Sequence, residues 1–213
     1  MKNKKISSCL ILISAPFFFG CGSVTGQNEN KAAASTLSLH VGNEKYFIID
    51  TKESVVTWKG WSVGGGYIGY VYISKGELMI ENGQLAGGTV EVDMNTIDEK
   101  THVEKKLIHH LKSPDFFDVE KFPFSTIVIT RAASINGETK KVTGNLTIKG
   151  ITNPVTFPAK IEVKSGIVNA SGKLVIDRTK WDIRYRSGKF YDNLANNTIS
   201  DSIEFNIKIV AKK

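Results

Sequence analysis

The amino-acid sequence predicts an all-β protein, an extended up-and-down antiparallel β-barrel of about eight strands with one short helix. Two observations lead to this fold class. Apolar and polar residues alternate with a period of two along several long segments, which is typical of strands with one buried face. Turn signals rich in glycine separate those segments and predict hairpins between neighbouring strands. A sheet built in this way protects its edges by closing into a barrel.

The strand pattern is clearest near the end of the chain, where apolar residues occupy every second position of 203–211. The same alternation predicts strands at residues 90–94, 142–148, 155–163 and 168–176. Turn signals follow at residues 81–83, 135–137, 149–150 and 164–166. Consecutive strands are therefore expected to be neighbours in the sheet.

One segment favours a helix. Residues 98–112 place apolar side chains at helical spacing, and Ser113-Pro114 provides the stop. The apolar residues are Val103, Leu107, Ile108 and Leu111.

A phenylalanine-rich crossing follows this helix, over residues 110–123. Its two prolines disfavour helix, and its aromatic rings Phe116, Phe117 and Phe122 each present a large apolar area that requires burial. We expect the crossing to pack against the inside of the barrel.

The N-terminus resembles a bacterial lipoprotein signal. Three lysines precede an apolar run at residues 9–19, which is too short to span a bilayer, and Gly20-Cys21 follows. Phe18 stands where a leucine is usual in such signals. We expect a signal peptide at residues 1–20, lipidation of Cys21, a tether at 21–44 and one barrel domain at 45–213. The alternative is an ordinary secretory signal that leaves Cys21 as a free thiol.

Charge and cysteine content narrow the function classes. Removing the three lysines of the signal from the formal charge of +7 leaves +4, which is a modest balance and not a nucleic-acid signature. A lipidated Cys21 leaves no thiol in the domain, which excludes disulfides and cysteine metal sites. Gly22 replaces the aspartate that retains many lipoproteins at the inner membrane, so we expect anchoring in the cell envelope, with the outer membrane favoured.

Four stretches carry a family resemblance: HLKSPDFFDVEKFPFST, VTGNLTIKGITNPVTFPA, DRTKWDIRYRSG and the closing ISDSIEFNIKIVAKK. They resemble the YceI-like family of lipocalin-like bacterial polyisoprenoid-binding proteins, over about residues 46–213. The resemblance implies an extended antiparallel barrel around an apolar cavity that holds an isoprenoid or similar amphiphilic lipid.

A tube of apolar side chains suits such a ligand, because each buried CH₂-sized group contributes about 0.8 kcal/mol. The residues expected to line it are Trp58, Val92, Phe116, Phe117, Phe122, Leu146, Phe157, Ile161, Leu174 and Phe205. Small residues expected on the inner face, which leave room, are Gly144, Ala159, Ala170 and Gly172. The alternative is that the same side chains simply fill the barrel as core.

A basic and aromatic segment at residues 178–191 is a candidate site for an anionic head group such as a diphosphate. The residues expected to form it are Arg178, Trp181, Arg184, Tyr185 and Arg186. The alternative is a solvated loop whose arginines pair with Asp177, Asp182 and Asp192.

Catalysis finds little support in the sequence. His102, His109 and His110 lack an obvious partner at metal-ligand spacing, and no hydrolase elbow, zinc-protease motif or P-loop occurs. We expect no metal, no cofactor and no enzyme activity. The predicted function is non-catalytic lipid binding by an envelope carrier or sequestering lipoprotein. An envelope interaction module with a dry barrel core is the alternative, and an uncharacterised enzyme is a distant third.

Overall fold

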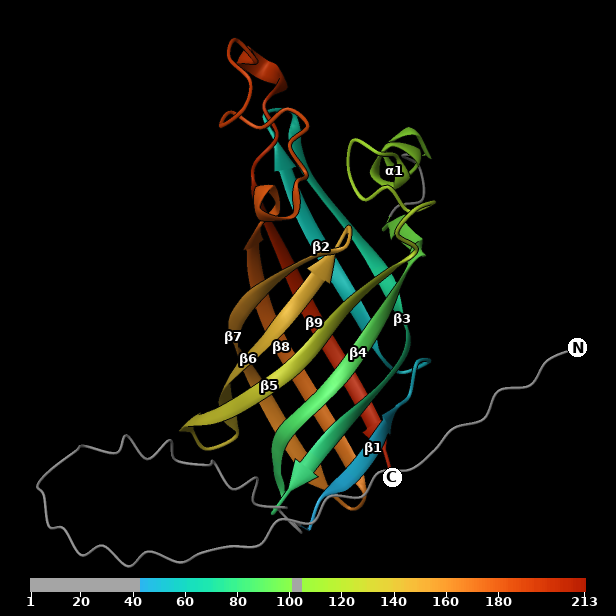
Figure 1. Cartoon of the computed structure of the whole chain (residues 1–213), viewed down its shortest axis with the longest axis vertical. Helices are drawn as coiled ribbons and strands as arrows, with labels where there is room; N and C mark the ends of the chain where they lie inside the picture. The colour runs from blue at the N-terminus through green and yellow to red at the C-terminus, as the bar shows by residue number, and fades with distance from the viewer. Residues whose placement is uncertain (1–42, 101–104) are drawn as a thin grey trace, which may run out of the picture. The chain divides into compact units, whose positions relative to one another are not determined.

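The computed structural model describes residues 43–100 and 105–213, and the statements below refer to these residues. They form one closed antiparallel sheet, interrupted by a helix and a long loop (Figure 1). The strands are β1 (Lys45–Ile49), β2 (Val55–Ser62), β3 (Gly65–Glu81), β4 (Gln84–Glu99), β5 (Phe124–Asn136), β6 (Thr139–Ile148), β7 (Ile151–Lys164), β8 (Ile167–Asp177) and β9 (Ser202–Lys212). The helix α1 is Lys105–Lys112, and two short 3-10 turns are η1 (Arg178–Trp181) and η2 (Ala195–Asn197).

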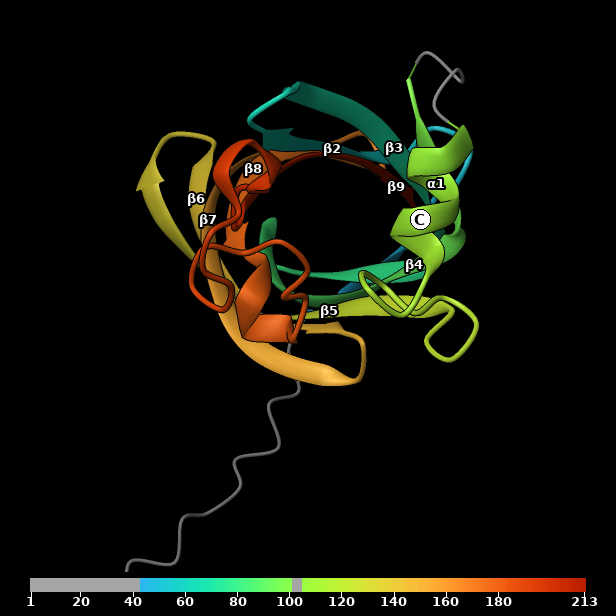
Figure 2. The same cartoon turned by 90° about the horizontal axis from the view of Figure 1, so that it is seen from above.

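Strands β2 to β9 pair in chain order, and β9 returns to pair with β2. Figure 2, which views the barrel from above, shows the resulting ring. This confirms the predicted eight-stranded up-and-down barrel. The additional strand β1 pairs with the C-terminal parts of β3 and β9. Strand β2 pairs with earlier parts of the same two strands, so β1 and β2 lie end to end between β3 and β9.

The break between β1 and β2 is closed by a side chain. The buried hydroxyl of Ser54 donates to the carbonyl of Val210 over 3.2 Å and accepts from the amide of Val210 over 3.0 Å. Between β1 and β2 the chain turns, and the Ser54 hydroxyl takes the place of a strand partner for the Val210 amide. The backbone of β9 therefore stays hydrogen-bonded there.

The predicted hairpin turns are present. At each of three turns a residue with positive φ precedes a glycine, as two-residue hairpins of the type I′ class require. The pairs are Asn82-Gly83, Lys149-Gly150 and Ser165-Gly166. The fourth turn, between β5 and β6, has Gly137 at φ +47°.

The helix is shorter than predicted. Residues 98 and 99 belong to β4, where Asp98 pairs with Tyr70 and Glu99 with Gly69. Val103 lies outside the described residues. The predicted strand ended at Met94, but β4 continues to Glu99 because β3 is long enough to pair with these residues too. This backbone pairing outweighs the local helical spacing of the side chains. The predicted end at Lys112 is confirmed.

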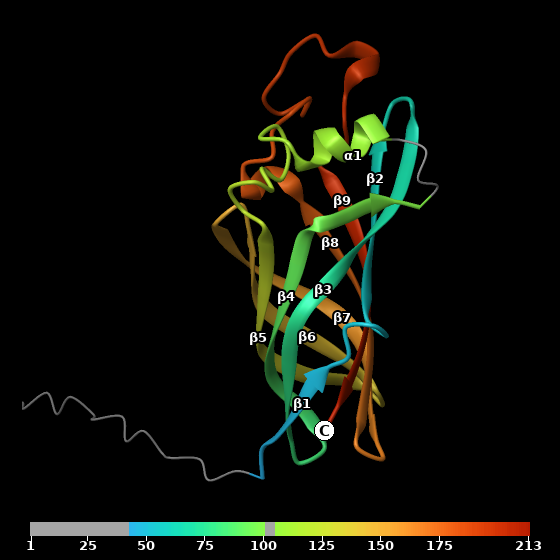
Figure 3. The same ribbon diagram turned by 90° about the vertical axis from the view of Figure 1, so that its right-hand side faces the viewer.

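The two ends of the barrel differ (Figures 1 and 3). One end, here called the mouth, holds α1, the tip of the β2–β3 hairpin and the β8–β9 loop at residues 178–201. The other end, here called the floor, holds β1 and the β3–β4, β5–β6 and β7–β8 turns. Among the described residues, no helix has the length and apolarity needed to cross a membrane.

Candidate functional site

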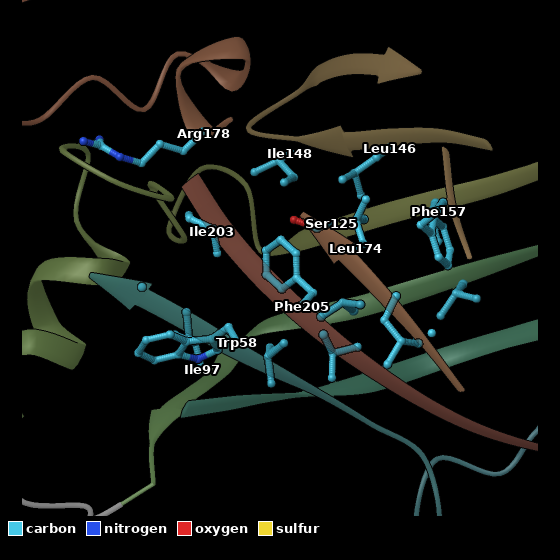
Figure 4. A pocket seen from close by; sticks show the side chains of 18 of the residues that line it. Trp58, Ile97, Ser125, Leu146, Ile148, Phe157, Leu174, Arg178, Ile203 and Phe205 are labelled. Atoms are coloured by element: carbon cyan, nitrogen blue, oxygen red, sulfur yellow. The ribbon is translucent and has the colours of Figure 1, made fainter. Parts of the chain in front are cut away.

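The interior of the barrel contains an apolar cavity of about 230 Å³ (Figure 4). Each of the strands β2 to β9 contributes side chains to its wall. Strand β9 contributes four of them, Ile203, Phe205, Ile207 and Ile209. The few polar side chains in the lining include Ser125 and Arg178. Such a wall offers burial to an apolar chain and little hydrogen bonding.

Exposure inside the barrel shows that this space is hollow. The β9 side chains Ile203, Phe205 and Ile207 line the cavity, yet each keeps intermediate accessibility instead of being buried. Packed core residues lose almost all of their accessible surface, as Val168 and Ala211 do at 0%. The interior therefore presents apolar surface of these β9 residues to an open space.

The cavity is closed at the floor and opens at the mouth. Toward the floor its lining residues Leu78 and Leu85 are buried, with Phe47 and Ile80 packed beside them. At the mouth, Trp61 and Tyr67 both line the cavity and remain exposed to solvent, at 42% and 38%. A ligand would therefore enter from the end that carries α1 and the β8–β9 loop.

Nine of the ten residues predicted to line the cavity do so. They are Trp58, Val92, Phe116, Phe117, Leu146, Phe157, Ile161, Leu174 and Phe205. Phe122 does not line it, and its prediction is corrected. Its ring lies beside the β6–β7 turn, where a Cβ added to Gly150 would be 3.0 Å from it, and Lys121 Nζ lies 5.2 Å from its centroid.

Three of the four small residues also line the cavity, namely Ala159, Ala170 and Gly172. Gly144 does not. A Cβ at Gly144 would lie 2.6 Å from the carbonyl oxygen of Val128, so this glycine allows close approach of β5 and β6 instead of making room for a ligand. Gly69 acts in a similar way, because a Cβ there would overlap the Trp58 ring and the Asp98 carbonyl.

The phenylalanine-rich crossing is tied to the β8–β9 loop by an aromatic cluster. The His110 ring lies 4.6 Å from Tyr185 and 4.9 Å from Phe116, both edge-on, and Phe116 lies 5.5 Å from Tyr185. His110 Nε2 also lies 2.9 Å from Asp115 Oδ2. This contact satisfies one ring nitrogen of His110 and is not part of a cluster of metal-ligating side chains among the described residues. His109 is exposed, and His102 lies outside the described residues.

Arg178 is a structural residue in this fold. It is 1% exposed, and its Nε, Nη1 and Nη2 donate to the carbonyls of Ser200, Ile183 and Ile199 at 3.0, 2.8 and 3.1 Å. Nη2 also lies 3.2 Å from Asp201 Oδ1. Burial lowers the pKa of the guanidinium, and the nearby carboxylates oppose that shift, so the group keeps its charge. Its donors hold the loop and leave little capacity for a head group.

The five residues predicted as a head-group site therefore do not converge, and that grouping is corrected. Trp181 is buried and donates its Nε1 to the carbonyl of Leu146 over 3.1 Å. Arg184 is exposed, pairs with Asp182 at 2.6 Å and lies 4.7 Å from the Phe190 ring. Arg186 is exposed and lies 5.2 Å from the ring of Tyr185.

The solvated-loop alternative predicts the Arg184–Asp182 pair correctly. Asp177, however, pairs with Lys189. In the part of the chain that the structure describes, no cluster of three His, Cys, Asp or Glu side chains is placed to hold a metal ion.

Sequence reasoning missed several lining residues. Ile97 lies between the predicted strand at 90–94 and the predicted helix at 98–112 and was assigned to neither, although it lines the cavity from β4. A bulge between β3 and β4 displaces the alternation, so Ile97 is out of phase with Val90, Val92 and Met94. Trp61 and Tyr67 were also missed. Trp61 comes three residues after the inward Trp58, so strand alternation predicts an outward side chain for it, although it lines the cavity at the mouth.

Comparisons with known proteins agree with this architecture. A model of the YceI-like domain matches residues 47–211. A UPF0312 protein of Pseudomonas putida is 31% identical over 115 residues, covering 51% of this chain and 58% of the relative. A UPF0312 protein of Shewanella denitrificans is 31% identical over 133 residues, covering 59% and 67%. The chain thus matches a little over half the length of the Pseudomonas relative.

Two solved structures share the fold. BcnA of Burkholderia cenocepacia superposes with a TM-score of 0.65 at 22% identity, covering 77% of this chain and 99% of that chain. A polyisoprenoid binding domain from Saccharophagus degradans, implicated in plant cell wall breakdown, superposes with a TM-score of 0.58 at 10% identity, covering 78% and 97%.

Proposed function

Because the chain belongs to the YceI-like family, we propose that it binds an isoprenoid or similar amphiphilic lipid in the barrel cavity. In this proposal the protein is a non-catalytic carrier or sequestering protein of the bacterial envelope. The Saccharophagus neighbour is a polyisoprenoid binding domain by its description, which supports a lipid ligand.

One observation carries the proposal. The inward side chains Ile203, Phe205 and Ile207 keep accessible surface inside a closed barrel, and they face a cavity with an apolar wall. Leaving apolar surface against an open space forfeits the stabilisation that packing would supply, at about 25 cal/mol per Å². A ligand with a slender apolar chain would restore it, because the chain fills the space between these side chains.

Anchoring is a second part of the proposal. The apolar run at residues 9–19 and Gly20-Cys21 support export and lipidation of Cys21, with the domain held at the outer membrane or facing the periplasm. A lipid anchor would keep the barrel near the membranes that contain its ligand.

The ligand hypothesis is tested by extraction. The purified protein is incubated with geranylgeraniol or with bacterial membrane lipid, repurified and extracted with organic solvent, and the extract is analysed by mass spectrometry. We expect one apolar ligand per protein. Repeated absence of a stoichiometric ligand would remove the main support for a carrier and favour an interaction module.

A pair of variants on β8 provides a matched control. Ala170→Phe places a ring in the cavity, and Asn169→Phe places the same ring on the exposed outer face, one residue earlier in the strand. We expect Ala170→Phe to abolish ligand recovery while the outer variant retains it. Thermal unfolding of both checks that the inner variant is folded, since overpacking costs about 1–3 kcal/mol.

A further inference from the structure

The mouth of the barrel carries a group of exposed apolar side chains, here named the mouth rim. Four belong to the β2–β3 hairpin and two to the β8–β9 loop: Trp61, Val63, Tyr67, Ile68, Phe190 and Tyr191. Their exposed fractions lie between 38% and 59%. Single exposed apolar residues are ordinary, but a group of this size at one end of a molecule marks an interaction surface.

The two segments of the rim are joined to each other. The amide of Ser200 donates to the carbonyl of Trp61 over 2.9 Å, and the amide of Val63 donates to the carbonyl of Thr198 over 3.3 Å. Ser62 and Ile199 form an antiparallel bridge between them. The hairpin tip and the loop therefore present one connected surface at the mouth (Figures 1 and 3).

The rim is continuous with the cavity. Trp61 and Tyr67 belong to both, because each lines the cavity and is also exposed to solvent. An apolar ligand that passes between cavity and exterior at this end has to move past these two rings.

The chemistry of the rim fits a lipid bilayer. Tryptophan and tyrosine are the side chains that proteins place at the level of lipid head groups, since their rings are apolar and their tips are polar. Exposed arginines accompany them on the loop: Arg186 lies against the Tyr185 ring, and Arg184, which is paired with Asp182, lies against the Phe190 ring. Cations beside such rings complement anionic lipid head groups.

We infer that the mouth rim docks on the surface of a lipid bilayer, so that ligand passes from the membrane into the cavity without crossing water. The ligand part of this inference rests on the proposed function, whereas docking depends only on the rim. Each CH₂ group that crosses water costs about 0.8 kcal/mol, so direct contact between the mouth and the bilayer removes a large barrier for a long chain.

The test compares two matched pairs of exposed residues. Val63→Ser with Tyr191→Ser removes two rim side chains that are 59% and 50% exposed. Ile48→Ser with Tyr46→Ser removes two side chains of the same kinds on β1 at the floor, which are 61% and 51% exposed. None of the four lines the cavity. All variants of the full chain also carry Cys21→Ser, so that no acyl chain masks a difference.

Two quantities are measured. The first is cosedimentation with vesicles of phosphatidylcholine and phosphatidylglycerol, where we expect about a tenfold loss for the rim pair and no change for the floor pair. The second is uptake of retinol, a fluorescent isoprenoid alcohol. We expect the rim pair to take up retinol more slowly from vesicles but to reach the wild-type level when retinol is delivered from ethanol.

Equal vesicle binding by all proteins, or equal losses in the rim and floor pairs, would overturn the inference. A change in self-association by sedimentation velocity with unchanged vesicle binding would also overturn it, because a second copy would then cover the rim. Failure of the proposed function has a different signature. In that case no protein takes up retinol from either source, while the rim pair still loses vesicle binding and the docking stands.

Discussion

The rings of Phe116 and Tyr185 lie 5.5 Å apart and connect the phenylalanine-rich crossing to the β8–β9 loop across the mouth. Phe116 lines the cavity, whereas Tyr185 does not. The contact therefore joins the wall of the cavity to a loop at its opening.

Loss of this contact should loosen the mouth. Tyr185→Ala is expected to destabilise the protein by about 1 kcal/mol, which is typical of an aromatic pair, and to accelerate release of bound retinol. Tyr185→Phe keeps the ring and should release retinol at the wild-type rate. Stopped-flow fluorescence measures both. Slower or unchanged release from the alanine variant would contradict a role of this contact at the mouth.

Arg178 and Arg186 should differ sharply in their effect on stability. Arg178→Met removes the donor to three backbone carbonyls and the nearer of the two cations of Asp201, which should lower the free energy of unfolding by about 3–5 kcal/mol. Arg186→Met removes an exposed cation and should change it by less than about 0.5 kcal/mol. Urea denaturation measures both. Similar values for the two variants would show that the buried hydrogen bonds do not hold the loop.

The barrel should lose stability in acid. The hydrogen bond from Lys212 lowers the pKa of Asp50, and the hydrogen bond from Lys173 lowers the pKa of Glu204. A carboxyl group with a lowered pKa in the folded state stabilises the fold above its unfolded pKa, and this contribution is lost as the pH falls through the folded value. We therefore expect the urea midpoint to fall below about pH 4.

Two adjacent lysines provide the control. Lys212 contacts Asp50 and Glu53, and these carboxylates raise its pKa to about 12. Lys212→Met should therefore reduce the acid dependence, whereas Lys213→Met at the exposed next position should not. Identical urea midpoints for the two variants between pH 2 and pH 7 would show that the Asp50 pair does not contribute.

The anchor is tested in cells. Cys21→Ser removes the thiol that a lipoprotein signal would acylate, and we expect the variant to leave the membrane fraction, since a folded domain held by rim contacts alone binds reversibly. Labelling with radioactive palmitate should be lost in the same variant. Undiminished fractionation with membranes together with unchanged labelling would exclude Cys21 as the lipidation site.

The alternation of residues along the strands predicts most of the fold, because a period of two in a half-buried strand fixes which side chains point inward. Phe205 and Leu174 were placed correctly on that basis alone. Phe122 was not, since it lies outside the strands, where periodicity carries no information. The role of Arg178 also could not be predicted, because its acceptors at Ile199 and Ser200 come from a distant part of the loop. Contacts of that kind arise only from the closed topology.

The length of β3 separates the rim from the floor. Residues of a barrel strand rise about 3.3 Å each and tilt by about 40°, so the 17 residues of β3 span roughly 40 Å from floor to mouth. A barrel that docks by its rim would therefore hold the floor, with β1 and its exposed Tyr46 and Ile48, roughly 40 Å from the bilayer surface. The two ends of the barrel would then face different surroundings, one lipid and the other water.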